Sequence, residues 1–263
     1  MKIRASYLTG YADCSRRTFL DMFYSEAEEF GYEFRRPVHH VGAAIGTASH
    51  RGIATDLQGI KDGKLITRSD AEAIGIEKYR ALSAERIGYD STSQNANVAE
   101  KHIRRILAKY YHDIHPGAKP LHVEKEFKVK YKGFLIVGHP DLIETDFKVV
   151  DFKTGARKTP YQAQLGMYAK ILEIISKEKC GGLTVAHIPR KKDMTNPVLK
   201  NYIYNVEASI NHAISLVDSI INHYNTFIET EEPSHILANP MSYLCSRKWC
   251  KAYGTDFCEL TKE

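Results

Sequence analysis

The chain has 263 residues, of which 43% are hydrophobic and 26% are charged, and its formal net charge at pH 7 is +5. This composition excludes disordered, fibrous and low-complexity proteins, and no apolar run reaches the roughly 18 residues that a membrane span needs. The first residues lack the apolar core of a signal peptide, so we expect a cytoplasmic protein without a membrane partner. The basic excess suits a polyanionic partner but is common among ordinary enzymes.

Four helices are predicted in the first part of the chain, where apolar residues recur with the spacing i, i+3, i+4. Phe19, Met22 and Phe23 begin the first of these patterns. The helices cover residues 14–30, 42–57, 70–86 and 97–111. The sequence therefore predicts a mostly helical region over about residues 11–115.

Alternation of apolar and polar residues replaces the helical period after Pro116 and Gly117. Strands are predicted at residues 121–131, 134–143 and 148–153, and their short connections favour an antiparallel meander. Thr159 followed by Pro160 is a good start for a helix over residues 160–179. Strands at 183–188 and 201–206 and a helix over 207–228 complete a chain of mixed α/β class.

Asp151 and Lys153 stand two residues apart on the third predicted strand, so their side chains point to the same face. Residues 138–141 are placed on the neighbouring strand, which brings Asp141 beside Asp151. Two carboxylates can hold Mg²⁺ or Mn²⁺, which neutralises a phosphate and lowers the pKa of a bound water. Lys153 can then stabilise the charge on the attacked phosphate. These residues predict phosphodiester hydrolysis; the alternative is an ordinary surface strand edge.

Five further residues are candidates for the same site. Gln164 and Tyr168 share one face of the predicted helix, where they either orient water or phosphate, or pack in the core. His50 follows small residues on a predicted helix and can bind Mn²⁺ as a neutral imidazole, although a structural role is the alternative. Arg157 and Lys158 follow the third strand and are candidate nucleic-acid contacts, or solvated surface charge.

The cysteines form a pattern of one residue near the start of the chain and three near its end. Cys14 stands at the first predicted helix, and Cys245, Cys250 and Cys258 lie in the C-terminal tail. Four thiolates can hold a [4Fe-4S] cluster or a zinc ion, or they can remain ordinary reduced cysteines. Cys180 lies outside the pattern and is interpreted as structural.

The motifs occur in the order Gly46-x-x-x-His50, Gly138-x-x-Asp141, Asp151-Phe152-Lys153 and Gln164-x-x-x-Tyr168. In this order they resemble those of the RecB-like PD-(D/E)xK nucleases. The resemblance implies a restriction-endonuclease-like core, with a central mixed sheet flanked by helices. It implies a site in which His50, Asp141, Asp151 and the carbonyl of Phe152 bind Mg²⁺ or Mn²⁺, Lys153 is catalytic, and Gln164 and Tyr168 complete the set. Glu124 is similar to a strand glutamate of these relatives.

The cysteine layout is similar to that of the iron–sulfur subset of this family, namely the AddB-type helicase-nucleases and the CRISPR-associated adaptation exonucleases. In those proteins one N-terminal and three C-terminal cysteines surround a [4Fe-4S] cluster. The spacing Cys-x4-Cys-x7-Cys here differs from the Cys-x2-Cys start common among them, so zinc or no metal stays open. One nuclease domain is expected over residues 1–263, with a catalytic core at about 119–206 and a C-terminal helix and cysteine tail at about 207–263.

The expected function is that of a metal-dependent DNA exonuclease acting on single strands or duplex ends. The resemblance implies a phage or prokaryotic setting of recombination, repair or spacer acquisition, with a recombination or helicase partner. One alternative is a non-catalytic, metal-stapled module that binds DNA or a partner. Another alternative is an endonuclease on the same core. Metal-dependent turnover separates the enzyme from the binding module, and cleavage of closed circular DNA separates the endonuclease.

Overall fold

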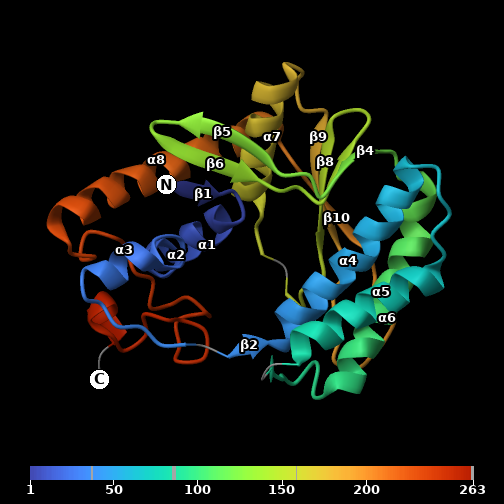
Figure 1. Ribbon diagram of the computed structural model, residues 1–263, viewed down its shortest axis with the longest axis horizontal. Helices are drawn as coiled ribbons and strands as arrows, with labels where there is room; N and C mark the ends of the chain where they lie inside the picture. The colour runs from blue at the N-terminus through green and yellow to red at the C-terminus, as the bar shows by residue number, and fades with distance from the viewer. Residues whose placement is uncertain (37, 85–86, 158, 262–263) are drawn as a thin grey trace.

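The computed structural model describes residues 1–36, 38–84, 87–157 and 159–261. It contains mixed sheets flanked by helices, which confirms the predicted fold class (Figure 1). The larger sheet has the order β10-β9-β8-β7-β4. Its strands are β4 (Pro120–Val123), β7 (Leu142–Glu144), β8 (Lys148–Lys153), β9 (Gly182–His187) and β10 (Lys200–Tyr204). The pair β8–β9 is parallel, whereas β4–β7, β7–β8 and β9–β10 are antiparallel.

Helices cover both faces of the larger sheet (Figure 1). One face packs against α4 (Val41–Lys61), α5 (Arg68–Ser83) and α6 (Ala96–Asp113), and the other against α7 (Gln162–Ser176), on which α8 (Val206–Thr230) packs in turn. Successive residues of β8 alternate between the two cores: Val150 and Phe152 join the α4–α6 side, whereas Val149 joins the α7–α8 side. Because strand side chains alternate, Asp151 and Lys153 point to the same face as Val149. Both lie at the C-terminal end of β8.

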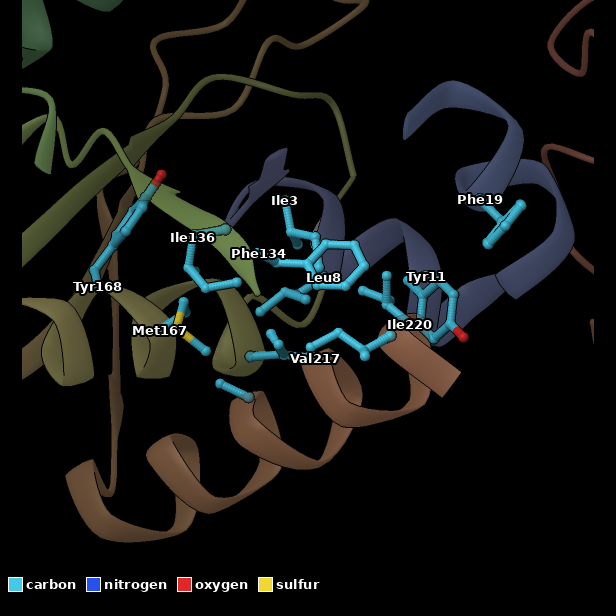
Figure 2. Packing of buried hydrophobic residues seen from close by; sticks show 14 of the residues in the cluster. Ile3, Leu8, Tyr11, Phe19, Phe134, Ile136, Met167, Tyr168, Val217 and Ile220 are labelled. Carbon is cyan, nitrogen blue, oxygen red and sulfur yellow. The ribbon is translucent and has the colours of Figure 1, made fainter. Parts of the chain in front are cut away.

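A smaller sheet adjoins the first and has the order β1-β6-β5. It consists of β1 (Lys2–Arg4), β5 (Phe127–Tyr131) and β6 (Phe134–Gly138). Figure 2 shows Ile3, Phe134 and Ile136 of this sheet packing with Leu8 of α1 (Tyr7–Asp13) and Val217 of α8. Tyr168 of α7 lies at the margin of this cluster, so the hydrophobic core directly supports one of the predicted site residues (Figure 2).

The predicted strands 121–131 and 134–143 form one antiparallel ribbon that bends and serves both sheets. The part next to the hairpin turn pairs β5 with β6 in the smaller sheet. The part farther from the turn pairs β4 with β7 in the larger sheet. The bend falls at Glu124, whose φ is 46°, and at Pro140, which has no N–H for a ladder hydrogen bond. The prediction of two continuous strands, with Asp141 inside the second, is therefore wrong. Asp141 lies in the bend, immediately before β7.

The helical predictions also need three corrections. The helix expected over residues 14–30 is two helices, α2 (Ser15–Met22) and α3 (Tyr24–Glu29), because the backbone leaves helical geometry at Phe23, whose ring packs against Phe19 and Tyr224. Thr159 and Pro160 precede α7 rather than starting it, since the N-cap is Tyr161. The region expected to be helical also contains two short paired strands, β2 (His39–His40) and β3 (Ile87–Gly88). The end of the helix predicted over 70–86 lies outside the described residues.

Two glycines allow close contacts that position α7. A Cβ at Gly166 would lie 2.0 Å from the backbone oxygen of Ser209, so α7 and α8 cross at a distance that excludes any side chain there. A Cβ at Gly138 would lie 3.0 Å from the ring of Tyr168. Both contacts fix how far the α7 side chains reach over the end of β8.

The C-terminal tail packs beside α1 and α2 (Figure 1) and contains the 3-10 helix η2 (Asp256–Thr261). A second 3-10 helix, η1 (His115–Gly117), follows α6. Arg16 donates hydrogen bonds to the carbonyls of Ile236 (2.9 Å) and Ser234 (3.0 Å). Asp13 and Arg17 both contact the hydroxyl of Ser242. Within the described part of the chain, no helix combines the length and apolar character needed to cross a membrane.

Candidate active site

Asp141 is the residue on which the bend of the ribbon, β8 and α4 converge. Its Oδ2 accepts a 2.6 Å hydrogen bond from the backbone N–H of Phe152, and its Oδ1 lies 3.1 Å from Nδ1 of His50. The backbone N–H of Phe152 is available for this contact because β8 continues beyond Val149 and Val150, its two residues that pair with β7. The carboxylate is therefore oriented by the sheet and by α4 together.

Glu124 is the second carboxylate at the bend. Its backbone N–H donates to the carbonyl of Asp141 at 3.1 Å, and its Oε2 lies 2.9 Å from Nδ1 of His139. Ligand atoms of Glu124, Asp141 and His50 all lie within 4.8 Å of one another. Two carboxylates and one imidazole form a donor set that fits Mg²⁺ or, with the nitrogen ligand, Mn²⁺.

Asp151 and Lys153 form an ion pair at the end of β8, with Nζ 2.7 Å from Oδ2. Asp151 is 1% exposed and faces the α7 side of the sheet. The ammonium of Lys153 also lies over the ring of Tyr161, 4.5 Å from its centroid. The side chain of Lys153 is thus held between a carboxylate and an aromatic face.

Gln164 links Asp151 to α7. Its Nε2 donates to Oδ1 of Asp151 at 3.0 Å and to the hydroxyl of Tyr168 at 2.9 Å. Gln164 is 5% exposed, so these hydrogen bonds are made away from bulk water. The amide fixes the orientation of the Asp151 carboxylate, and Tyr168 fixes the amide.

The buried charges change the protonation of the site. Burial raises the pKa of Asp151 to about 6, with Lys153 opposing the rise and Asp141 adding to it. Burial and the Asp141 carboxylate raise the pKa of Glu124 to about 7. Burial disfavours the ammonium of Lys153, but Asp151 and Asp141 outweigh it and raise its pKa to about 12. Lys153 therefore remains a cation at neutral pH and can stabilise negative charge, not accept a proton.

His50 and Asp141 shift each other toward the charged pair. Burial lowers the pKa of His50, but the charge of Asp141 outweighs it, so that pKa is raised overall. Burial raises the pKa of Asp141, but the charge of His50 outweighs it and that pKa is lowered overall. A bound divalent cation would compete with the proton of His50 for the same ligand atoms.

Two open spaces meet at Lys153. On the α4 side, a cleft of about 930 Å³ is lined by His50, Glu124, Asp141 and Lys153 among others. On the other side, a groove of about 810 Å³ continues past Tyr161 and Gln164 to Tyr243 in the tail. There the guanidinium of Arg157 lies 4.1 Å from the centre of the Tyr243 ring. Lys158, its predicted companion, lies outside the described residues.

The four cysteines of the predicted pattern line one small pocket between α2 and the tail. Cys14, Cys245, Cys250 and Cys258 meet there, and all four thiols are free of disulfide bonds. Burial raises the pKa of Cys250 to about 11, and Cys14 and Cys258 contribute to this rise by their charge. Cys180 lies elsewhere, against the carbonyls of Phe147 and Gly182. A cluster of buried sulfur donors is a fitting environment for a thiophilic metal centre.

The structure thus brings the residues of the predicted motifs together in one site, although their chemical roles stay predictions. His50 with Asp141, Asp151 with Lys153, and Gln164 with Tyr168 are direct contacts. Asp151 does not belong to the three-residue donor group, in which Glu124 takes that place. The sequence signal for Glu124 was weak, because the residue follows a short strand and stands in a positive-φ bend.

Comparison with known proteins gives a family match and matches to solved structures. The family model described as "PD-(D/E)XK nuclease superfamily" matches residues 4–252. No curated protein matches the chain. A crystal structure described as a "putative exonuclease" from Eubacterium rectale has a TM-score of 0.58 at 11% sequence identity, covering 93% of this chain and 86% of that chain. A crystal structure of SSO0001 has a TM-score of 0.28 at 12% identity, covering 75% of this chain and 84% of that chain. The first match shows a shared fold alone, and the second supports no argument.

Proposed function

The chain belongs to the PD-(D/E)XK nuclease superfamily, and from this premise we propose that it is a metal-dependent DNA exonuclease that acts on single strands or duplex ends. The observation that carries the proposal is the buried constellation of Asp141, Asp151 and Lys153 at the end of β8. An ordinary strand edge would leave these groups in water, whereas here both carboxylates are at most 8% exposed.

His50, Glu124 and Asp141 would hold the metal ion, with Asp151 beside them. A divalent cation bound there supplies charge neutralisation at the phosphate and acidifies a water molecule. The carbonyl of Phe152 was also implied as a ligand, and the strand end at which it lies is adjacent to the same carboxylates. These assignments rest on the chemistry of the donor set.

Lys153 would face the phosphate with its ammonium, which stays charged at neutral pH. The ammonium would stabilise the negative charge that the phosphoryl oxygens carry during attack. Gln164 and Tyr168 would keep Asp151 in position for this step, through the two hydrogen bonds described above. Arg157 would contact the strand on the far side of Lys153.

The four cysteines would hold a [4Fe-4S] cluster, or a zinc ion, that joins the two ends of the chain. Their shared pocket and the burial of Cys14, Cys250 and Cys258 support this proposal. A cluster would give a brown protein with visible absorbance, and iron analysis after anaerobic purification tests it. A colourless preparation that contains zinc would overturn the cluster and leave the nuclease proposal intact. We place the enzyme in phage or prokaryotic recombination, repair or spacer acquisition, with a helicase or recombination partner.

The proposal is tested with end-labelled linear DNA and covalently closed circular DNA, each incubated with Mn²⁺. An exonuclease removes nucleotides from the linear strand only, and the Asp151→Asn variant leaves both substrates whole. Cleavage of closed circles would instead indicate an endonuclease. Binding of DNA without turnover under any divalent cation would indicate a non-catalytic module and contradict the proposal.

A further inference from the structure

A basic and aromatic pocket lies apart from the catalytic cleft, where the segment after α3 meets the tail. Its volume is about 510 Å³, and it is lined by Tyr24, Arg35, Arg36, Lys248, Trp249 and Lys251, with His39 and His40 at one side. No carboxylate is among the described residues that line it. A concentration of cations with aromatic rings between them is the composition that binds single-stranded nucleic acid.

The cations of this pocket are largely accessible. Arg35, Arg36 and Lys248 are exposed, and the ammonium of Lys248 lies over Trp249, 4.8 Å from the ring centroid. Lys251 is the exception, because its Nζ is 2.9 Å from Oδ1 of Asp21. Arg35, Arg36 and Lys248 are therefore exposed at the rim, where they can bind phosphate groups. Lys248 can exchange its contact with the ring for one with a phosphate.

The aromatic surface, in contrast, is held in place. His40 packs edge-on against Trp249, with ring centroids 4.4 Å apart. The same imidazole caps α4 by accepting from the N–H of Gly42 at 3.1 Å, and its Nε2 lies 3.4 Å from Asp90. Cys250 follows Trp249 directly and belongs to the cysteine pocket. Trp249 is thus positioned by the start of α4 on one side and by the cysteines on the other.

Helix α4 connects this pocket to the catalytic cleft. It begins beside His40 and carries His50 ten residues later, a distance of about 15 Å at about 1.5 Å per residue. Along the way Gly46 lies against Thr154, which follows β8. At an axial rise of about 3.4 Å for each nucleotide of a helically stacked strand, this length corresponds to roughly four nucleotides.

We propose that this pocket holds the substrate strand as single-stranded nucleic acid, roughly four nucleotides from the bond that is cleaved. Arg35, Arg36 and Lys248 bind its phosphates, and Trp249 stacks with an unpaired base. A duplex buries the faces of its bases and offers phosphates alone, so the aromatic surface selects the single strand. The inference rests on the proposed function, because it names the form of the strand that the same enzyme cleaves.

Trp249 is the one tryptophan of the sequence, so intrinsic fluorescence reports on this pocket without a label. The experiment titrates oligothymidylate into the Asp151→Asn protein without added divalent cation, which separates binding from turnover. We expect the fluorescence of Trp249 to be quenched, and quenching to weaken with salt. A blunt DNA duplex of equal charge should bind at least tenfold more weakly at this site.

Charge reversal tests which cations bind the strand. Arg36→Glu with Lys248→Glu should weaken oligothymidylate binding at least tenfold and reduce the logarithmic salt slope by about 1.4, at about 0.7 for each lost phosphate contact. Lys191→Glu with Lys192→Glu changes the net charge equally on another surface and serves as the matched control. Both double variants should keep the melting temperature of the parent.

The outcomes separate this inference from the proposed function. Equal weakening by the two double variants, unchanged fluorescence of Trp249, or equal affinity for the duplex would each overturn the inference. A protein that shows the predicted quenching but cleaves no DNA contradicts the proposed function alone. Wild-type enzyme adds a second readout, since KM should rise for strands that end before they reach the pocket, whereas kcat should change little.

Discussion

The candidate catalytic edge, which is the end of β8 with Asp141 beside it, and the cysteine pocket hold their polar groups together by different means. At the edge, Asp151, Phe152 and Lys153 come from one strand, and a backbone N–H of that strand orients Asp141. In the tail as far as Thr261, no strand supports the cysteines, and their surroundings depend on side chains such as Arg16 and Arg17. The sheet therefore fixes the geometry of this edge, whereas the cysteine pocket depends on the attachment of the tail to α2. The two regions should respond differently to substitution.

Loss of Asp151 should affect catalysis most strongly. Asp151→Asn removes the charge that pairs with Lys153 beside the proposed metal site, so we expect cleavage to fall about 10³-fold with little change in melting temperature. Asp146→Asn, on the exposed turn before β8, is the matched control and should keep its activity. A variant Asp151→Asn that cleaves at the wild-type rate would show that this edge is not the active site.

Loss of Cys250 should affect stability more than chemistry. Cys250→Ser removes one ligand of the proposed centre, and a loss of about 3 kcal/mol would lower the melting temperature by about 6–12 °C, at about 2–4 °C for each kcal/mol. Metal content, measured on the same preparation, should fall as well. Cys180→Ser, a buried cysteine outside the pocket, should change neither quantity. Equal stability of both variants would mean that no centre fastens the tail.

Gln164 is expected to act through Asp151. Gln164→Leu removes the donor to Asp151 and leaves the shape of the core, so we expect kcat to fall about tenfold while KM stays within about twofold. Tyr168→Phe keeps the ring and should cost less, because Asp151 retains its hydrogen bond from Gln164. Steady-state kinetics on one single-stranded substrate measure both effects. An increase in KM alone would assign Gln164 to substrate binding.

The raised acid pKa values predict the smallest effect, a pH dependence of metal binding. The folded protein holds the protons of Glu124 (pKa about 7) and Asp151 (pKa about 6) more tightly than the unfolded chain does. The metal-free protein should therefore lose stability as the pH rises through about 6 to 7, and Mn²⁺ should bind about tenfold more tightly at pH 8 than at pH 6. Thermal shift with and without Mn²⁺ measures both trends. Glu124→Gln should flatten the trend, and a pH-independent Mn²⁺ effect would contradict it.

The sequence predicts the parts of the site that depend on local periodicity. Period two along a strand places Asp151 with Lys153, and the i, i+4 spacing places Gln164 with Tyr168, and both pairs are in contact. The sequence predicts Asp141 within a strand that runs from Phe134 through Pro140 to Ile143. Its place in a bend depends on how the ribbon divides between two sheets, and that division is a tertiary property.

Other features could not be predicted from sequence periodicity, because they too depend on tertiary structure. β1 has three residues, too few to show a periodic pattern. It pairs with β6, which is distant from it in the sequence. No periodic pattern in the sequence marks Glu124 as a site residue. The direction of its carboxylate depends on the positive φ of the bend, which the periodicity of the sequence does not predict. The convergence of Cys14 with the C-terminal cysteines could be expected from the family resemblance, since their separation in sequence contains no geometric information.

The most direct test of the account concerns Lys153, the cation that the fold places beside two buried carboxylates. Lys153→Ala and Lys148→Ala, on the same strand, are compared on end-labelled single-stranded DNA with Mn²⁺. The account predicts a fall in kcat of about 10²- to 10³-fold for Lys153→Ala, with an unchanged thermal shift by Mn²⁺, and no loss for Lys148→Ala. Equal rates for the two variants would contradict the assignment of this edge as a catalytic site.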